Sequence, residues 1–140
     1  MLIEGYASLF GVEDLAGDVV RAGAFAQTLA RGGEVAMLLQ HRGGAPAGRW
    51  TTMREDGRGL YVRGLIDPSL RAGAAALKLV REEGMRGLSI GFVARDWSPR
   101  VATGRDLRAL ELREVSLVMS PMLPGAGFLA MLGAPNLQAA

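Results

Sequence analysis

Stretches rich in β-forming residues, several with apolar residues at alternate positions, recur along the chain and indicate a mainly β protein. Two of them, 48–53 and 60–66, are separated by the turn-forming residues Glu55-Asp56-Gly57, so we expect a hairpin there. The run 35–40 is continuously apolar and is typical of a buried strand. The predicted strands are 2–10, 35–40, 48–53, 60–66, 88–97 and 107–119.

Two other stretches carry apolar residues at helical spacing. The first helix is predicted over 22–31, where the pair Gly32-Gly33 ends it. The longer one is predicted over 69–83, with Ser69 as its N-cap and Gly84 as its stop. Its buried face is expected to hold Leu70, Ala74, Leu77 and Val80.

The order of these elements, with strands dominant and two helices inserted, favours an α+β fold that is mainly β. We expect an antiparallel or mixed β-barrel rather than regular βαβ winding. The length of 140 residues fits one domain, expected over 1–132. The segment 133–140 is predicted to be a flexible tail.

Composition excludes several classes of function. There is no cysteine and one histidine, so neither disulfides nor a clustered metal site is expected, and no motif implies a cofactor. Sixteen basic residues nearly balance fourteen acidic ones, and no interleaving of aromatic and basic residues suggests a nucleic-acid partner. No signal peptide or membrane span is expected, which favours a cytoplasmic protein.

The stretch Gly87-Leu88-Ser89-Ile90-Gly91-Phe92 places a serine with a glycine two residues to either side. In a strand, Ser89 then shares a face with Gly87 and Gly91, away from the apolar face. Glycine weakens a strand interior and is usually there because a ligand or another backbone comes close. The pattern therefore suggests a nucleophile under an extended peptide. The alternative is that the glycines mark a bulge and the serine is a small filler.

The same letters also match the G-x-S-x-G elbow of α/β-hydrolases. In that fold the acid and the histidine follow the serine along the chain. Here the only histidine, His41, precedes Ser89, so the elbow interpretation fails.

His41 follows a buried strand and precedes a loop that contains glycine and proline. Side chains at such strand ends reach into clefts, and an imidazole is the base best suited to activate a serine near neutral pH. His41 is therefore the candidate general base. A structural histidine is the alternative.

Glu114 is the candidate acid that orients the imidazole. Side chains alternate between the two faces of a strand, so Glu114 is expected on the face of Leu110, Leu112 and Val118. A carboxylate among apolar side chains needs a partner. His41 would supply one. The alternative is an arginine, for which the sequence offers Arg86, Arg95 and Arg113.

Several short blocks, in order, resemble the prohead (procapsid maturation) protease family of tailed phages, whose fold is similar to that of the herpesvirus assemblins. These blocks are Gly5-Tyr6-Ala7-Ser8, Gly17-Asp18-Val19-Val20, Leu39-Gln40-His41, Gly59-Leu60, Gly87-Leu88-Ser89-Ile90-Gly91-Phe92 and Glu114-Val115-Ser116-Leu117-Val118.

The resemblance implies a serine endopeptidase with His41 as base, Ser89 as nucleophile and Glu114 as the third member. Assemblins use a second histidine in that third role, which this chain lacks. The resemblance also points to the backbone that follows the last member, 120–123, for oxyanion donors. The expected oxyanion and substrate-binding positions are Gly87, Gly91, Ser120 and Met122.

The family's role further implies a partner and a place of action. The expected partner is the major capsid protein, whose N-terminal or scaffolding segment would be removed inside the immature capsid, with the protease also trimming itself. A phage, a prophage or a gene transfer agent is the expected source, and a homodimer is a candidate state because assemblins gain activity on dimerising. The rival interpretations are a catalytically silent capsid-assembly factor on the same fold and a small esterase of unrelated fold.

Overall fold

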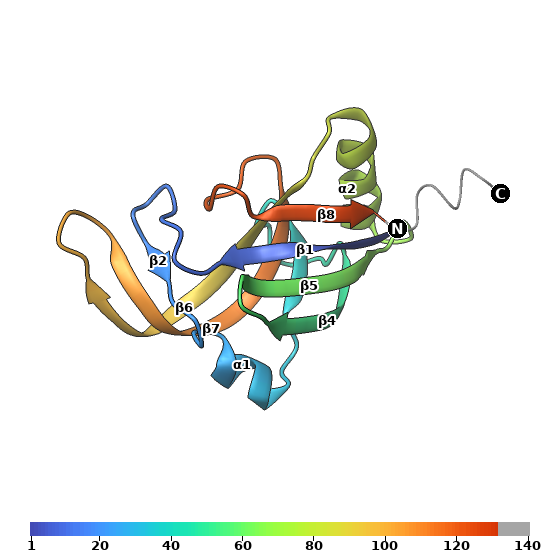
Figure 1. Cartoon of the computed structure of the whole chain (residues 1–140). Coiled ribbons are helices and arrows are strands. Elements are labelled where there is room, and N and C mark those ends of the chain that lie inside the picture. The colour runs from blue at the N-terminus through green and yellow to red at the C-terminus, as the bar shows by residue number, and fades with distance from the viewer. Residues whose placement is uncertain (132–140) are drawn as a thin grey trace.

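Seven strands of the chain close into a barrel. The computed structural model describes residues 1–131. Around the barrel the order is β7-β3-β4-β5-β1-β8-β6, and β6 returns to pair with β7, while β2 adds to β7 outside this ring (Figure 1). The strands are β1 Leu2–Leu9, β2 Val19–Val20, β3 Ala36–Leu39, β4 Gly48–Glu55, β5 Gly59–Ile66, β6 Gly87–Pro99, β7 Arg105–Val118 and β8 Gly127–Met131, and the helices are α1 Ala26–Arg31 and α2 Arg71–Glu82.

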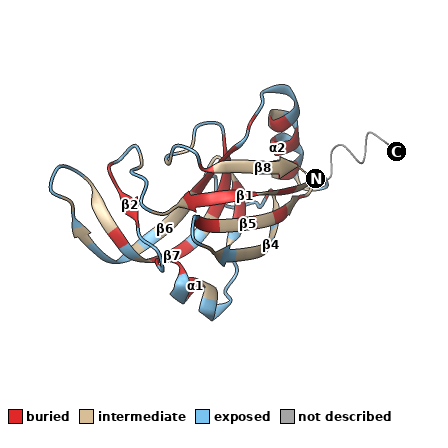
Figure 2. Cartoon of the chain, viewed as in Figure 1, coloured by how far each residue is buried: buried red, intermediate tan, exposed pale blue. Residues whose placement is uncertain are grey.

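Strand direction makes this a mixed barrel. β2 and β3 run parallel to β7, and the other pairings are antiparallel. The prediction of a mainly β, antiparallel or mixed barrel with two helices is therefore confirmed. The interior is filled by wholly buried side chains from several strands, among them Leu60, Leu88, Val115 and Leu117. Figure 2 shows buried stretches of β1, β5, β6 and β7 in the wall of the barrel. The end of the β6–β7 hairpin that extends beyond the barrel is largely exposed.

Helix α2 packs through part of the predicted face, since Leu77 and Val80 are buried as expected but Ala74 is not. Its buried residues are Gly73, Ala76, Leu77 and Val80, whereas Ala74 is exposed. Gly73 is required there because a Cβ atom would lie 1.8 Å from the carbonyl oxygen of Asp67. The N-cap is Leu70, not Ser69, because Asp67 accepts hydrogen bonds from the Ser69 N–H at 2.9 Å and hydroxyl at 2.6 Å and holds that serine in the preceding turn.

Helix α1 is shorter than predicted and completes the edge of β7. It ends at Gly32, whose φ of 66° is the left-handed conformation that glycine adopts readily. The hydroxyl of Thr28 donates to the carbonyl of Leu110 at 3.1 Å and accepts the N–H of Leu112 at 3.0 Å. Thr28 therefore satisfies the part of the β7 edge that lies between the pairings with β2 and β3.

Strand β8 was not predicted. The segment after Ser120 is rich in proline and glycine, yet its end, Gly127–Met131, pairs with β1 and meets β6 at Gly87. Backbone pairing on both sides therefore places these residues in the barrel, although the sequence predicted no strand there. The predicted tail 133–140 and the domain boundary at 132 lie outside the described residues.

Candidate active site

The β6–β7 ladder brings the predicted nucleophile and acid to one face of the sheet. Ser89 is paired with Ser116, and Gly91 is paired with Glu114. Directly paired residues share a face, so these four lie on the same side. The neighbouring pairs, such as Leu88 with Leu117, point into the core. Ser89 and Glu114 are thereby held on adjacent strands.

A bulge in β7 corrects the predicted face of Glu114. Phe92 is paired with Leu112 and Gly91 with Glu114, so Arg113 is the extra residue on β7. Leu110 and Leu112 are buried before the bulge, and Val115 and Leu117 are buried after it. Glu114 therefore does not share the face of Leu110 and Leu112, as strict period two had predicted. It projects from the opposite face.

His41 reaches this face from the end of β3, which lies on the other side of β7. The Gln40 N–H donates to the carbonyl of Leu117 at 2.9 Å and extends the β3–β7 pairing to the residue before the histidine. Gln40 and His41 have φ of 53° and 60°, a left-handed conformation that is costly for residues other than glycine. Such backbone strain is found at functional sites, and here it turns the chain at the histidine.

The imidazole of His41 and the carboxylate of Glu114 are hydrogen-bonded. His41 Nδ1 lies 2.7 Å from Glu114 Oε1, with the His41 side chain 45% exposed and the Glu114 side chain 15% exposed. The same Oε1 accepts the hydroxyl of Ser116 at 2.5 Å. The acid is therefore fixed by two donors.

Sequence reasoning did not single out Ser116, which is wholly buried. The signal was present in the sequence, because Ser116 follows Glu114 by two residues and period two places both on one face. A buried hydroxyl beside a carboxylate is the hydrogen-bond donor that such an acid needs.

The arginines considered as alternative partners of Glu114 are engaged elsewhere. Arg86 donates to the carbonyl oxygens of Val80 and Met85. Arg95 and Arg113 both pair with Glu111 at 2.5 Å. The pKa of Glu111 is lowered, mainly by its hydrogen bond with Arg95. His41, and not one of these arginines, is therefore the partner of the Glu114 carboxylate.

The two glycines that flank Ser89 have packing reasons of their own. A Cβ atom on Gly91 would lie 2.5 Å from Cγ of Glu114, so this glycine makes room for the acid. A Cβ atom on Gly87 would lie 2.6 Å from the carbonyl oxygen of Val118 and 3.0 Å from Pro121 Cδ. Glycine is therefore needed at both positions by the protein's own side chains and backbone.

Ser89 is 7% exposed and belongs to the lining of a small cavity of about 40 Å³. Met122, one of the predicted oxyanion positions, lines the same cavity, and Ser120 lies exposed in the same loop. The structure describes no hydrogen bond between Ser89 and His41. Catalytic hydrogen bonds are often long in free enzymes and tighten when substrate binds.

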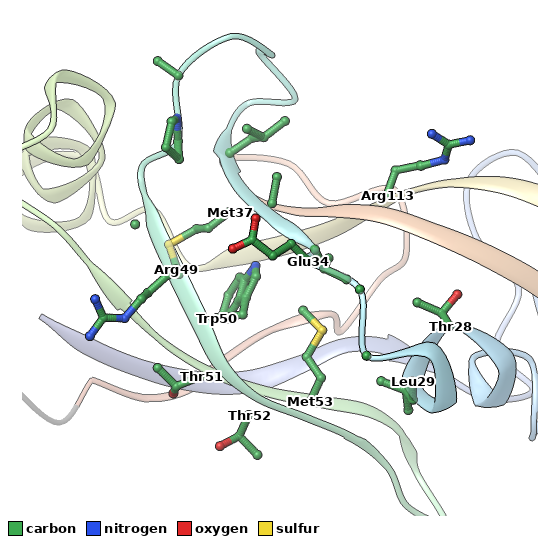
Figure 3. A pocket seen from close by; sticks show the side chains of 18 of the residues that line it. Thr28, Leu29, Glu34, Met37, Arg49, Trp50, Thr51, Thr52, Met53 and Arg113 are labelled. Atoms are coloured by element: carbon green, nitrogen blue, oxygen red, sulfur yellow. The ribbon is translucent and has the colours of Figure 1, made fainter.

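A larger groove of about 820 Å³ runs along β3, β4 and α1 (Figure 3). It follows from the short pairing of β3 with β4, which joins only Ala36 to Arg49 and Met37 to Gly48. Ser89, His41 and Glu114 are not part of its lining, so this groove is separate from the candidate site. Within residues 1–131 there is no group of three acidic or histidine side chains arranged to hold a metal ion, and no helix long and apolar enough to cross a membrane.

This chain is similar to known proteins in sequence and in structure. Over 135 aligned residues the chain is 41% identical to the prohead protease of Enterobacteria phage HK97. The aligned region covers 93% of this chain and 60% of the HK97 protein. The structure is similar to that of the KSHV protease, which was solved in complex with a hexapeptide phosphonate inhibitor. The TM-score is 0.59 and the sequence identity is 11%, and the match covers 99% of this chain and 68% of that one. Residues 1–131 match the caudovirus prohead serine protease family, and the chain belongs to it.

Proposed function

We propose that this protein is a serine endopeptidase of capsid maturation, with Ser89 as nucleophile, His41 as general base and Glu114 as the acid that orients the imidazole. The observation that carries the proposal is the 2.7 Å contact between His41 Nδ1 and Glu114 Oε1, made on the same face of the sheet as Ser89.

The contact determines which ring nitrogen acts as the base. When Nδ1–H donates to the Glu114 carboxylate, Nε2 is left without a proton and can accept the one on the Ser89 hydroxyl. Ser89 Oγ then attacks the peptide carbonyl carbon, and the imidazolium returns its proton to the leaving amine as the acyl-enzyme forms. Water, activated by the same imidazole, hydrolyses the acyl-enzyme and restores the serine. Glu114 stabilises the positive charge on His41 during both steps.

The loop after β7 supports the oxyanion assignment. The backbone N–H groups of Ser120 and Met122 donate no hydrogen bond to any residue that the structure describes. Free N–H groups beside the nucleophile are the donors that a developing oxyanion requires. Gly87 and Gly91 remain candidates for substrate contact, although their lack of side chains is explained by internal packing.

The free edge of β6 provides a place for an extended peptide. One edge of β6 is paired with β7, but the other meets β8 only at Gly87. From Ser89 onward this second edge is unpaired within the described chain. A peptide that adds as a strand there would run past the nucleophile and be held by main-chain hydrogen bonds.

The substrate we propose is the major capsid protein, cut at its N-terminal or scaffolding segment inside the immature capsid, together with the protease itself. The family and the HK97 relative, which is named a prohead protease, support this assignment. The chain spans 60% of that relative's length. A homodimer and an origin in a phage, a prophage or a gene transfer agent are proposed with it.

The test is to co-express the chain with the capsid protein encoded beside it and to measure the intact mass of the capsid protein. We expect a trimmed capsid protein with the wild type and an untrimmed one with Ser89→Ala, which removes no core volume. Labelling of Ser89 by a fluorophosphonate would separate the protease from a catalytically silent assembly factor. Normal trimming by Ser89→Ala would contradict the proposal.

A further inference from the structure

The 40 Å³ cavity beside Ser89 lies between segments that are distant in the sequence. Ser8 comes from β1 and Val12 from the segment after it, Ile90 follows the nucleophile on β6, and Leu123 comes from the loop that carries the oxyanion candidates. The cavity therefore adjoins both the nucleophile and the place where a substrate carbonyl would sit.

Ser8 is the unusual residue of this cavity. Its side chain is 1% exposed, and its hydroxyl is the one buried side-chain polar atom in residues 1–131 that has no hydrogen-bond partner. Burying a hydroxyl without a partner is unfavourable, so such a group calls for an explanation.

A bulge in β1 turns Ser8 inward. The pairing of β1 with β5 shifts register between Tyr6 and Ser8, which leaves Ala7 as the extra residue. Ser8 is paired with Leu60, which is wholly buried, so Ser8 shares the inner face. Bulges often re-aim a side chain next to an active site.

The carboxylates that also line the cavity are already engaged. Asp18 pairs with Arg105 at 2.8 Å, and Asp14 Oδ1 accepts the backbone N–H groups of Ala16 and Asp18. The rest of the lining is mainly apolar, with Val20, Phe92 and Leu107 among its residues. Apart from the nucleophile Ser89, the Ser8 hydroxyl is thus the polar group of this lining that is both buried and without a partner.

We propose that this cavity receives the substrate side chain immediately before the cleaved bond, and that Ser8 is a specificity-determining residue that selects a serine or threonine there. The inference rests on the proposed function. A cavity of about 40 Å³ has room for a few non-hydrogen atoms and not for a lysine, arginine or aromatic side chain. A substrate hydroxyl would give the Ser8 hydroxyl the partner that the free protein lacks.

The experiment uses the full chain and fluorogenic peptide-amide pools, each with one fixed residue before the cleaved bond and mixed residues elsewhere. The variants are Ser8→Ala and the matched control Ser98→Ala, which removes a half-buried β6 hydroxyl outside the cavity. We expect the wild type and Ser98→Ala to cleave the serine and threonine pools fastest. In Ser8→Ala the ratio of serine and threonine to alanine and valine cleavage should fall about five- to tenfold, the worth of one hydrogen bond.

Thermal melting shows whether Ser8 acts in substrate recognition or in the stability of the fold. Because Ser8→Ala deletes an unpartnered hydroxyl, its Tm should equal or exceed that of the wild type. An unchanged cleavage ratio, a lowered Tm with an unchanged ratio, or a preference for lysine or arginine would overturn the subsite. So would labelling of wild-type Ser89 by a fluorophosphonate without cleavage of the serine and threonine pools. If the wild type is neither labelled nor cleaves any pool, the proposed function fails and the subsite with it.

Discussion

The two walls of the barrel are built differently. The wall formed by β4, β5 and β1 is antiparallel, and Tyr6 and Tyr61 stack edge-on there with ring centroids 6.0 Å apart. The hydroxyls of these tyrosines donate to Asp56 and Glu4. Ser8, which the bulge in β1 turns inward, is a buried polar side chain of this wall. This wall is a hairpin extended by one strand.

The wall formed by β3, β7 and β6 gathers its irregular features around one site, whereas the other wall has isolated bulges at Ala7 and Thr51. The β3–β7–β6 wall includes the parallel pairing with β3, the bulge at Arg113, the left-handed residues Gln40 and His41, and the buried hydroxyls of Ser89 and Ser116. Each of these is unfavourable in a strand, and they occur together where the serine, histidine and acid meet. The comparison teaches that this wall is shaped by the site, whereas the other is shaped mainly by folding and contributes Ser8 to the cavity beside Ser89. Mutations in the two walls should therefore affect different quantities.

The largest expected effect is on the catalytic wall. Ser89→Ala and His41→Ala should each lower turnover by about 10⁴- to 10⁶-fold, and the double variant should be little worse than either because the two residues act as one unit. Turnover of a cleavable peptide, measured for the two single variants and the double variant, tests this. Losses that multiply would show that His41 acts independently of Ser89 and has a structural role.

The substitution Glu114→Gln should cause the next largest loss of turnover. The amide keeps the size of the side chain but no longer stabilises the imidazolium, so turnover should fall on the order of 10³- to 10⁴-fold with little change in Tm. Turnover and Tm are measured on the same preparation. Full activity with a lowered Tm would remove Glu114 from the site and leave it a structural role.

Ser116→Ala tests how firmly the acid must be held. The change removes the hydroxyl that donates to Glu114 Oε1 at 2.5 Å but leaves the contact with His41. A hydrogen bond to a charged group is worth about 1.5–3 kcal/mol, so turnover should fall about 10- to 100-fold. Turnover and Tm measured on the same preparation distinguish positioning from packing, since a looser carboxylate stabilises the imidazolium less and lowers turnover while the barrel stays folded. A lowered Tm with unchanged turnover would make Ser116 structural.

The two walls also differ in how far the sequence predicts them. The β4–β5 hairpin follows from local turn chemistry at Glu55-Asp56-Gly57, and the structure forms it there. The identity of the serine, the histidine and the glutamate as candidates could also be predicted, because the alternatives are few in a chain with one histidine.

Features that depend on non-local register could not be predicted. Period two assumes an unbroken strand, so the bulge at Arg113 reversed the expected face of Glu114. The choice between His41 and an arginine as partner depends on β3 lying beside β7, a parallel pairing between segments far apart in sequence. Strand β8 has weak propensity of its own and is held by pairing with β1, which no local pattern reveals.

The smallest expected effect lies on the wall formed by β4, β5 and β1 and concerns stability at acid pH. The hydrogen bond from the Tyr6 hydroxyl, followed by those from the N–H groups of Arg58 and Gly59, lowers the pKa of Asp56 below its ordinary value of 3.8. A carboxyl whose folded-state pKa is lowered contributes stability that is present above the unfolded pKa and is lost as pH falls through the folded pKa. The Tm difference between the wild type and Asp56→Asn should therefore be fully present at about pH 5 and should shrink towards about pH 2.

The variant Tyr6→Phe provides the control for that prediction, since it removes the donor with the largest effect on the Asp56 carboxyl. It should reduce the same pH dependence, and adding Asp56→Asn to it should change the dependence little further, because the two residues share one interaction. Turnover at neutral pH should stay near the wild-type value in all three variants, since neither residue lines the cavity beside Ser89 or is hydrogen-bonded to the serine, the histidine or Glu114. A loss of turnover as large as that of Ser116→Ala would show that the two walls are coupled, and the division of the barrel into a folding wall and a catalytic wall would be wrong.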